Sequence, residues 1–488
     1  MNPSESIWTK NIQMPERESL KKDLRTDAVI IGGGMAGILT AHCLKQAGLR
    51  TIVLERGSVG SGQTRNTTAK ITSQHGLIYH RLITQLGRER AAQYAAANQD
   101  AVSRYRQWIG DLGIDCDFTP CSACLYTASR VGDLEREAAA AQSLGIDVRC
   151  TQEAELPMRV SMAMEFTNQA RFHPLAFLRA VASPLEIYEN TPVVTVADGE
   201  IHTPNGNVRA DYIIFCCHYP FVNVPGWYFL RMHQERSYVL ALEKAARIRN
   251  MYLGIDADGL SLRQQGDLLL LGGGSHRAGE NSAGGRYAKL QDTALRFWPH
   301  CRTAAAWSAQ DCMTLDGVPY IGRFSARTPN SFVATGFGKW GMTSSMVSAN
   351  LICDLITKGK SPWEDVFSPQ RFRIGASVKN LMHNTAQTVK GQSRRIFSLP
   401  RAGVDSLACG HGGVVRYRGK QIGVYKDENG VMFAVDICCP HLKCRLEWNP
   451  DEKSWDCPCH GSRFDYRGKC LTEPAQCDLH AYIIENIK

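Results

Sequence analysis

The chain has 488 residues, a mass of 54.1 kDa and a formal net charge of +9, and 44% of its residues are hydrophobic. This length predicts about three domain-sized units, each able to bury a core. The modest positive charge is spread along the chain without a base-reading motif, which argues against nucleic-acid binding, and no apolar run is long enough to span a bilayer.

The first residues lack the charged-then-apolar pattern of a secretory signal, so we expect a cytoplasmic protein. A reducing compartment would keep most of the eighteen cysteines as thiols or metal ligands. Residues 1–26 are interpreted as an N-terminal extension, because the first clear strand pattern begins at Asp27.

A strand, a glycine-rich turn and a helix are predicted in succession over Asp27–Ala47. The turn contains Gly32, Gly34 and Gly37, which let the backbone approach a pyrophosphate at the positive end of the helix. The next strand, Thr51–Glu55, ends in a carboxylate placed to accept the ribose hydroxyls of an adenine dinucleotide. This motif alone leaves FAD and NAD open.

Further segments resemble the D-amino acid oxidase and glycine oxidase superfamily of flavoproteins, and this resemblance implies FAD. Gly60–Lys70 resembles the loop that passes the pyrophosphate and the flavin ring, and Glu189–Val194 resembles the strand that covers the adenine. Gly317–Gly322 and Ala334–Thr343 resemble the late pair that closes the flavin site. The second of these opens a helix whose N-terminal amides can face the flavin C2 carbonyl, with Thr343 as the side chain expected there.

The resemblance implies an α/β FAD-binding Rossmann-like domain over 27–360, split by an inserted antiparallel-sheet α+β substrate domain around 75–185 and 225–300. Cys312 is offset from the position at which some relatives attach the flavin, so we expect noncovalent FAD. The expected FAD-binding residues are Gly32, Gly34, Met35, Ala36, Gly37, Glu55, Arg56, Gln63, Thr64, Arg65, Asn66, Thr67, Thr68, Val194, Gly338, Gly341, Met342 and Thr343.

Candidate catalytic side chains follow from the same resemblance. Lys70, beside the flavin loop, could pair with a substrate carboxylate or tune the flavin, and a surface or phosphate-side lysine is the alternative. Arg231, His233 and Arg236 lie in the region where relatives bind substrate carboxylates. The alternative for each of these is an ordinary strand residue.

Three cysteines in the predicted substrate domain have the C-x4-C-x2-C spacing of plant-type ferredoxin sites: Cys116, Cys121 and Cys124. No fourth ligand follows at a suitable place, and the flanking sequence predicts strands. Buried thiols are therefore expected in place of a second cluster. Residues 361–404, basic around Lys390–Arg395, are interpreted as a linker, with a docking surface for an acidic carrier such as a ferredoxin as the alternative.

Two short motifs near the C-terminus combine cysteine with histidine. Cys439-Pro-His441 is followed by fifteen residues and then by Cys457-Pro-Cys459-His460. Two thiolates and two imidazoles at this spacing predict a Rieske [2Fe-2S] cluster, in which the cysteines hold one iron and the histidines hold the other. The expected ligands are Cys439, His441, Cys457 and His460. Zinc is the alternative, because the same residue types also build tetrahedral zinc sites.

The block Cys457–Asp465 closely resembles the Rieske family, and the resemblance extends from Ser406 to Lys488. It implies an all-β Rieske domain over 405–488. It also implies a disulfide between Cys444 and Cys459, the extra cysteines that accompany the two ligand pairs.

Departures from the Rieske pattern bear on the reduction potential, because hydrogen bonds to the cluster sulfurs stabilise the reduced state. Ser462 can donate one such bond. Phe464 stands where many high-potential members have a tyrosine that donates to a ligand sulfur, so we expect a lower potential. Lys443 and Glu473 replace usual glycines, which bears on loop geometry and not on ligation.

The two expected cofactors, FAD and the Rieske [2Fe-2S] cluster, imply an oxidoreductase. The resemblance implies oxidation of a C–N bond of an amino acid or amine by hydride transfer to FAD, with single electrons leaving through the cluster to an external acceptor such as a ferredoxin or a quinone. One alternative is a reductase or oxygenase component whose cluster delivers electrons inward, although no two-His, one-carboxylate iron site is evident. A redox-sensing protein is the other.

Overall fold

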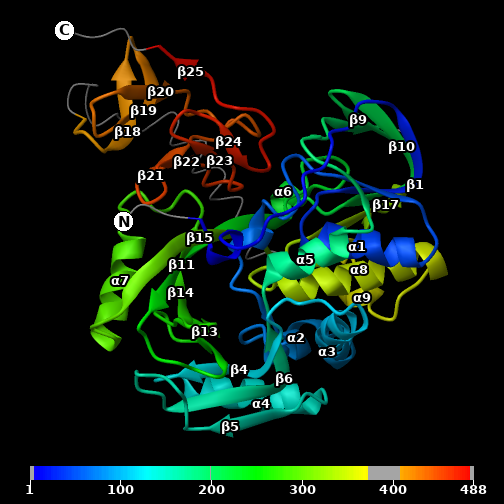
Figure 1. The fold of residues 1–488 in the computed structure, drawn as a ribbon, viewed down its shortest axis with the longest axis vertical. Coiled ribbons are helices and arrows are strands. Elements are labelled where there is room, and N and C mark those ends of the chain that lie inside the picture. The colour runs from blue at the N-terminus through cyan, green and yellow to red at the C-terminus, as the bar shows by residue number, and fades with distance from the viewer. Residues whose placement is uncertain (1–4, 198, 372–406, 484–488) are drawn as a thin grey trace.

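The structure, a computed structural model, describes residues 5–197, 199–371 and 407–483. The described residues form an eight-stranded sheet, a nine-stranded sheet and two four-stranded sheets. The two larger sheets belong to the N-terminal part, and the two smaller ones form a separate C-terminal domain (Figure 1). Within the described part of the chain, no helix combines the length and apolarity needed to cross a bilayer.

The eight-stranded sheet contains the predicted glycine turn. Its central strands pair in parallel in the order β17-β10-β1-β2-β7, and β16 pairs antiparallel with β17. The continuous apolar runs of β1 and β2 are buried on both faces, as a helix-covered parallel sheet requires. The strands are β1 Leu24–Ile31, β2 Thr51–Leu54, β7 Glu186–Tyr188, β8 Thr195–Ala197, β9 Glu200–Thr203, β10 Gly206–Phe215, β16 Tyr320–Ser325 and β17 Thr328–Thr335.

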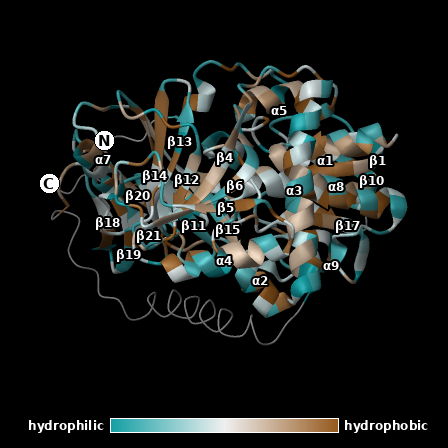
Figure 2. Ribbon diagram, turned by 90° about the horizontal axis from the view of Figure 1, so that it is seen from below, coloured by the Kyte–Doolittle hydropathy of each residue, from teal (hydrophilic) through white to brown (hydrophobic). Residues whose placement is uncertain are grey.

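Helices cover this sheet and build the largest core. In Figure 2 the apolar residues of α1 and α8 lie beside the apolar strands β1, β10 and β17. The short helix α9 buries Val366 and Phe367 against the same part of the molecule, so the chain beyond residue 360 still packs here as far as residue 371. The helices are α1 Met35–Gln46, α3 Arg88–Asp111, α5 Pro174–Ala182, α8 Gly341–Lys358 and α9 Glu364–Phe367, and the 3-10 turns are η1 Ile7–Thr9 and η2 Gln63–Asn66.

The nine-stranded sheet takes most of its strands from the two ranges expected for an inserted domain, 75–185 and 225–300, while β3 and β15 lie outside them. It follows the order β15-β11-β14-β13-β12-β4-β6-β3, and β5 pairs with β6. Its described pairings are antiparallel except between β4 and β12, so the sheet is mixed at that one place. Its strands are β3 Lys70–Ile71, β4 Thr119–Thr127, β5 Val148–Thr151, β6 Met162–Arg171, β11 Met232–Glu243, β12 Met251–Gly254, β13 Ser261–Gln265, β14 Leu268–Arg277 and β15 Arg302–Thr314, and its helices are α2 Tyr79–Leu86, α4 Val131–Ser143, α6 Tyr228–Arg231 and α7 Arg286–Phe297.

The C-terminal domain consists of short antiparallel strands, as predicted. It lies over β11, β15 and α7 of the N-terminal part (Figure 1). The predicted linker lies largely outside the described residues, which resume at residue 407. The strands are β18 Gly412–Tyr417, β19 Lys420–Lys426, β20 Met432–Val435, β21 Glu447–Asn449, β22 Ser454–Asp456, β23 Arg463–Asp465, β24 Cys470–Thr472 and β25 Ala481–Tyr482.

Candidate functional site

The predicted glycine turn joins β1 to α1 at the carboxyl end of the parallel strands. A Cβ atom added to Gly32, whose φ is +113°, would lie 2.6 Å from the carbonyl oxygen of Cys216, and one added to Gly37 would lie 1.9 Å from that of Gly32. Only glycine fits at either position. The carboxylate of Glu55 accepts hydrogen bonds from the amides of Gly33 at 2.7 Å and Gly57 at 2.8 Å, and burial raises its pKa. Glu55 thus braces the turn, and each oxygen keeps a second acceptor site.

The loop that follows β2 is tied to three other segments. The hydroxyl of Thr64 accepts from the Met35 amide at 3.0 Å, at the start of α1. Trp8 of the N-terminal extension donates to the carbonyl of Thr67 at 2.7 Å, and Trp307 of β15 donates to that of Asn66 at 3.0 Å. The expected pyrophosphate loop is therefore held against α1.

The start of α8 meets the segment after β3. Thr343 is 1% exposed, and its hydroxyl donates to the carbonyl of Thr72 at 3.1 Å, so this side chain is already engaged within the protein. Tyr105 donates to the carbonyl of Met342 at 2.9 Å. Val194, in contrast, lies in a loop beyond β7 and is 52% exposed. The segment 189–194 is thus a loop, and the strand ends at Tyr188.

A polar cluster lies beside the glycine-rich segment that precedes α8. The ammonium group of Lys339 lies 3.2 Å from Glu235 and donates to the Ser275 hydroxyl at 2.7 Å, and Glu235 lies 3.5 Å from the His233 ring. The bond with His233, aided by Lys339, lowers the pKa of Glu235 to about 2 despite its partial burial. Burial raises the pKa of the neighbouring Asp311 to about 7. Nδ1 of His233 has no partner among the described residues and stays available to a ligand.

Two of the other candidate catalytic residues are held by protein groups. Lys70 donates to the carbonyl of Tyr252 at 2.9 Å and to the Ser261 hydroxyl at 2.7 Å, and burial, aided by Arg263, lowers its pKa to about 7. The guanidinium of Arg231 donates to two backbone carbonyls and stacks on Tyr228 and Tyr320. Of the four candidates, His233 is the one that the structure places in the cluster around Lys339.

The opposite face of β11 contacts the C-terminal domain. Because successive side chains of a strand point to opposite faces, Gln234 and Arg236 point away from His233. Gln234 donates to the carbonyl of His460 at 2.7 Å, and Arg236 forms an ion pair of 2.6 Å with Glu452. This strand therefore separates the polar cluster from the predicted iron-sulfur site. Arg236 serves the domain interface.

The four predicted cluster ligands converge in two facing loops. The thiols of Cys439 and Cys457 are buried and hydrogen-bond each other, which raises the pKa of the first and lowers that of the second. The ring centroids of His441 and His460 lie 5.0 Å apart. Burial lowers the pKa of His441 to about 4 and that of His460 to about 3, so both imidazoles are neutral, as metal binding requires. The Nδ1 atoms of both rings are buried without partners among the described residues. This donor set fits a [2Fe-2S] cluster with Cys2His2 ligation.

The imidazole side of this site faces the N-terminal part. Nε2 of His441 lies 3.0 Å from the Asn223 amide oxygen, which fixes the tautomer that leaves Nδ1 free for a metal. The ring of Phe229 meets both histidines edge to face, at 6.3 Å from His441 and 5.9 Å from His460. The cluster site is therefore covered by the segment between β10 and β11.

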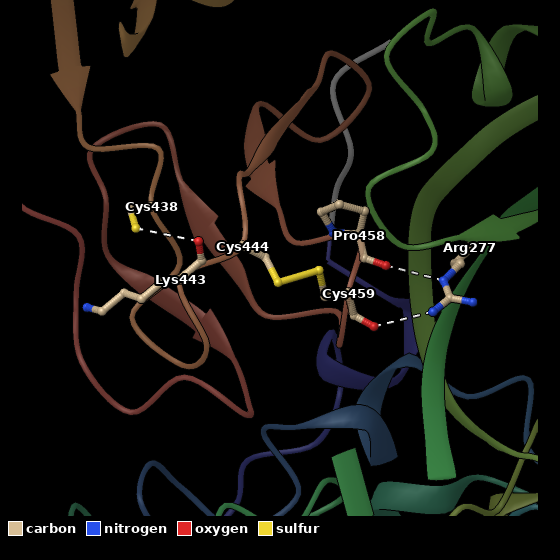
Figure 3. The surroundings of a disulfide bond; sticks show 6 residues. All are labelled: Arg277, Cys438, Lys443, Cys444, Pro458 and Cys459. Atoms are coloured by element: carbon tan, nitrogen blue, oxygen red, sulfur yellow. Dashed lines mark hydrogen bonds between the residues drawn. A yellow bond between two sulfur atoms is a disulfide. The ribbon is translucent and has the colours of Figure 1, made fainter. Parts of the chain in front are cut away.

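A disulfide joins the two ligand loops, as predicted (Figure 3). It links Cys444 to Cys459, so in the close group of sulfurs formed by these two and Cys457 only Cys457 is a free ligand. Figure 3 shows Arg277 of β14 donating to the carbonyls of Pro458 at 3.2 Å and Cys459 at 3.3 Å. The second ligand loop is thus bound to the nine-stranded sheet.

The departures from the Rieske pattern have visible consequences. Lys443 adopts a left-handed conformation, φ 59°, which explains why glycine is usual there. Glu473 forms an ion pair of 2.8 Å with Arg56, which follows Glu55 in the loop after β2. Ser462 interacts with the Cys439 thiol, whereas Phe464 is fully buried and has no hydroxyl.

Comparison with known proteins also divides the chain into an N-terminal oxidoreductase part and a C-terminal Rieske domain. The family model for FAD dependent oxidoreductases (DAO) matches residues 27–355, and the model for the Rieske [2Fe-2S] domain matches residues 400–483. The chain belongs to the DAO family of FAD-dependent oxidoreductases. It carries a C-terminal Rieske domain, so the two expected cofactors are FAD and a [2Fe-2S] cluster.

Individual relatives share one or both parts of this DAO-family chain. A Bacillus subtilis (strain 168) protein named as a Rieske 2Fe-2S iron-sulfur protein, YhfW, is 36% identical over 96% of both chains. Glycine oxidase from Geobacillus kaustophilus superposes with a TM-score of 0.60 at 20% identity, over 72% of this chain and 99% of that one. L-Amino acid deaminase from Proteus vulgaris superposes with a TM-score of 0.59 at 16% identity, over 74% of this chain and 100% of that one. The last two show the shared fold.

Glu235, Asp311 and Lys339 are not among the site residues predicted from the sequence. Lys339 lies inside the segment that resembles the flavin-closing pair, so its place in that segment was the available signal. Period-two alternation along β11 would have grouped Glu235 with His233 and separated both from Arg236.

Proposed function

We propose that this oxidoreductase oxidises a C–N bond of an amine or amino acid and passes the electrons singly through its Rieske cluster to an external acceptor such as a ferredoxin or a quinone. When bound, FAD would take two electrons and a proton from the substrate as a hydride equivalent, and water would hydrolyse the resulting imine. The chain's own residues would position the substrate and keep the two cofactor sites apart.

One observation carries the proposal: β11 presents His233 and Glu235 to the cluster around Lys339, and Gln234 to the loop of the ligand His460. A single strand therefore contacts both sites. The ammonium of Lys339 suits a carboxylate group, whereas the carboxylate of Glu235 suits a cationic amine. This pair of opposite charges supports an amino acid or amine as the substrate.

The imidazole side of the cluster faces Asn223 and Phe229 of the oxidoreductase domain. This placement favours transfer within the chain over a cluster that serves only outside partners. The glycine oxidase and L-amino acid deaminase folds support the same substrate class. Among the described residues Cys444 and Cys459 alone form a disulfide, and the remaining described cysteines keep their thiols, which supports a cytoplasmic location.

Anaerobic rapid mixing of the purified holoprotein with amino acids and amines tests the proposal. We expect flavin bleaching first and then the EPR signal of the reduced cluster. In the matched variant His460→Ala, the flavin should still bleach, but a one-electron acceptor should no longer be reduced. Absence of bleaching with every amine, together with rapid cluster reduction by a reduced ferredoxin, would instead support inward electron flow.

A further inference from the structure

One loop of the Rieske domain contacts the two segments expected to hold the adenosine half of FAD. This loop, 473–476, lies between β24 and β25, and it reaches both the loop after β2 and the segment beyond β7. The carboxylate of Glu473 forms the ion pair of 2.8 Å with Arg56, and the side-chain amide of Gln476 donates to the carbonyl of Val193 at 3.5 Å. Residues of the Rieske domain therefore stand beside a site whose predicted residues all belong to the oxidoreductase domain.

The two contacted segments are bonded to each other around Glu55, the carboxylate expected to accept the ribose hydroxyls. The backbone amide of Thr191 donates to the carbonyl of Glu55 at 2.9 Å, and that of Asn190 donates to the carbonyl of Gly57 at 2.9 Å. Arg56 lies between the two accepting residues in the chain. A ribose held by Glu55 would therefore have Arg56 as a neighbour, and the ion pair brings the Rieske carboxylate to the same place.

The loop is anchored by bonds that do not involve the carboxylate. The backbone carbonyl of Glu473 accepts from Gln234 of β11 at 3.0 Å, and the amide of Ala475 donates to the Ser462 hydroxyl at 3.0 Å. Glycine, the usual residue at position 473, would keep these bonds but could not form the ion pair. The carboxylate therefore adds a contact with Arg56 to a loop that is already held in place.

We propose that Glu473 is a positioning residue for FAD: it holds the guanidinium of Arg56 beside the adenosine half of the cofactor, so that the docked Rieske domain slows the release of FAD. A long side chain held by an ion pair loses less rotamer entropy when a ligand binds beside it. By reciprocity, bound FAD would stabilise the docked position of the Rieske domain. This inference concerns the retention of FAD and is independent of the substrate and of the direction of electron flow.

The rate at which the full-length holoprotein releases FAD, measured as the rise in flavin fluorescence after dilution, tests the inference. Glu473→Gln keeps the shape of the side chain and removes its charge, so we expect FAD to leave about fivefold faster, as the loss of a partly exposed ion pair allows. Salt screens such a pair, so higher salt should speed release from the unaltered protein more than from Glu473→Gln. Glu428→Gln is the matched control, because it breaks a pair of 2.9 Å with Lys453 inside the Rieske domain and should leave the release rate unchanged.

Two further variants keep the test decisive. Glu473→Gly restores the usual residue of this position and should release FAD as fast as Glu473→Gln, also if the latter fails to retain its cluster. In an Arg56→Gln background, Glu473→Gln should no longer speed release, because the carboxylate acts through Arg56. Unchanged release from Glu473→Gly, or faster release on adding Glu473→Gln when Arg56 is already replaced, would overturn the assignment.

Discussion

Arg236 of β11 and Glu452 of the Rieske domain form a buried ion pair, with 2.6 Å between Nη2 and Oε2 and side-chain exposures of 2% and 9%. Glu452 also pairs with Arg463 at 3.1 Å. A charge pair withdrawn from water in this way requires both partners, because either charge alone would be left buried and uncompensated. The pair therefore fixes the Rieske domain on the nine-stranded sheet.

Removing the arginine should destabilise this contact. We expect Arg236→Met to lower the free energy of unfolding by about 3 kcal/mol, near the lower end for a broken buried pair because Arg463 still faces Glu452. Urea unfolding measures the change. Arg209 forms an ion pair with Glu200, and its side chain is 73% exposed. Arg209→Met should therefore lower the free energy of unfolding by less than about 1 kcal/mol. Equal effects of the two variants would contradict a special role for the interface pair.

Acid should weaken the same contact. Burial opposes ionisation of Glu452, but Arg236 and Arg463 hold its pKa below the usual value. A lowered folded pKa means that the unfolded state binds the proton first as pH falls. The contribution to stability is thus complete above about pH 5 and is lost as pH falls through the folded pKa. Urea midpoints between pH 7 and 3 should fall less steeply in Glu452→Gln than in the unaltered protein.

Iron binding should depend on the predicted ligands and not on the buried cysteines elsewhere in the chain. We expect His460→Ala to lose iron, acid-labile sulfide and the EPR signal of the reduced cluster, because it removes one of the two imidazole ligands. Cys116→Ala, at another buried cysteine, should retain all three. Zinc in place of iron in the purified protein would refute the cluster assignment.

FAD binding should fail when the glycine turn is filled. A side chain at position 37 would meet the carbonyl oxygen of Gly32 at 1.9 Å, so Gly37→Ala should yield protein with little bound flavin. Gly110→Ala is the control, because a Cβ at Gly110 of α3 meets nothing within 4 Å. The flavin-to-protein absorbance ratio reports both. Normal flavin content in Gly37→Ala would exclude this turn as the binding loop.

Asp311 should confer a titration near neutrality. Burial raises its pKa to about 7, so the unfolded state loses the proton first as pH rises and the group destabilises the fold increasingly between about pH 4 and 7. We expect Asp311→Asn to raise the thermal midpoint at pH 8 and to have little effect at pH 4. If Asp311 acts at the substrate site, a step near pH 7 in kcat/KM should also disappear. An unchanged stability difference at the two pH values would rule out the raised pKa.

The amino-acid sequence alone determined the features that depend on local spacing. The strand, turn and helix around Gly32 and the ligand loops of Cys439 and Cys457 are each encoded within a few consecutive residues. For that reason a dinucleotide-binding turn and the cluster ligands could be predicted from the residues themselves, whereas FAD, the domain architecture and the disulfide followed from the resemblance to known families. Such patterns reflect backbone geometry and ligand chemistry that need no distant partner.

The way in which the two redox sites face each other depends on contacts between segments far apart in the chain. Lys339 meets Glu235, and Arg236 meets Glu452 across 216 positions of the chain, because sheet register and domain docking bring these segments together. Arg236, one of the two arginines expected near the substrate, lies on the face of β11 that contacts the Rieske domain. Neither contact has a local signal, since any charged residue on a strand could point to either face until the register and the docking partner are known.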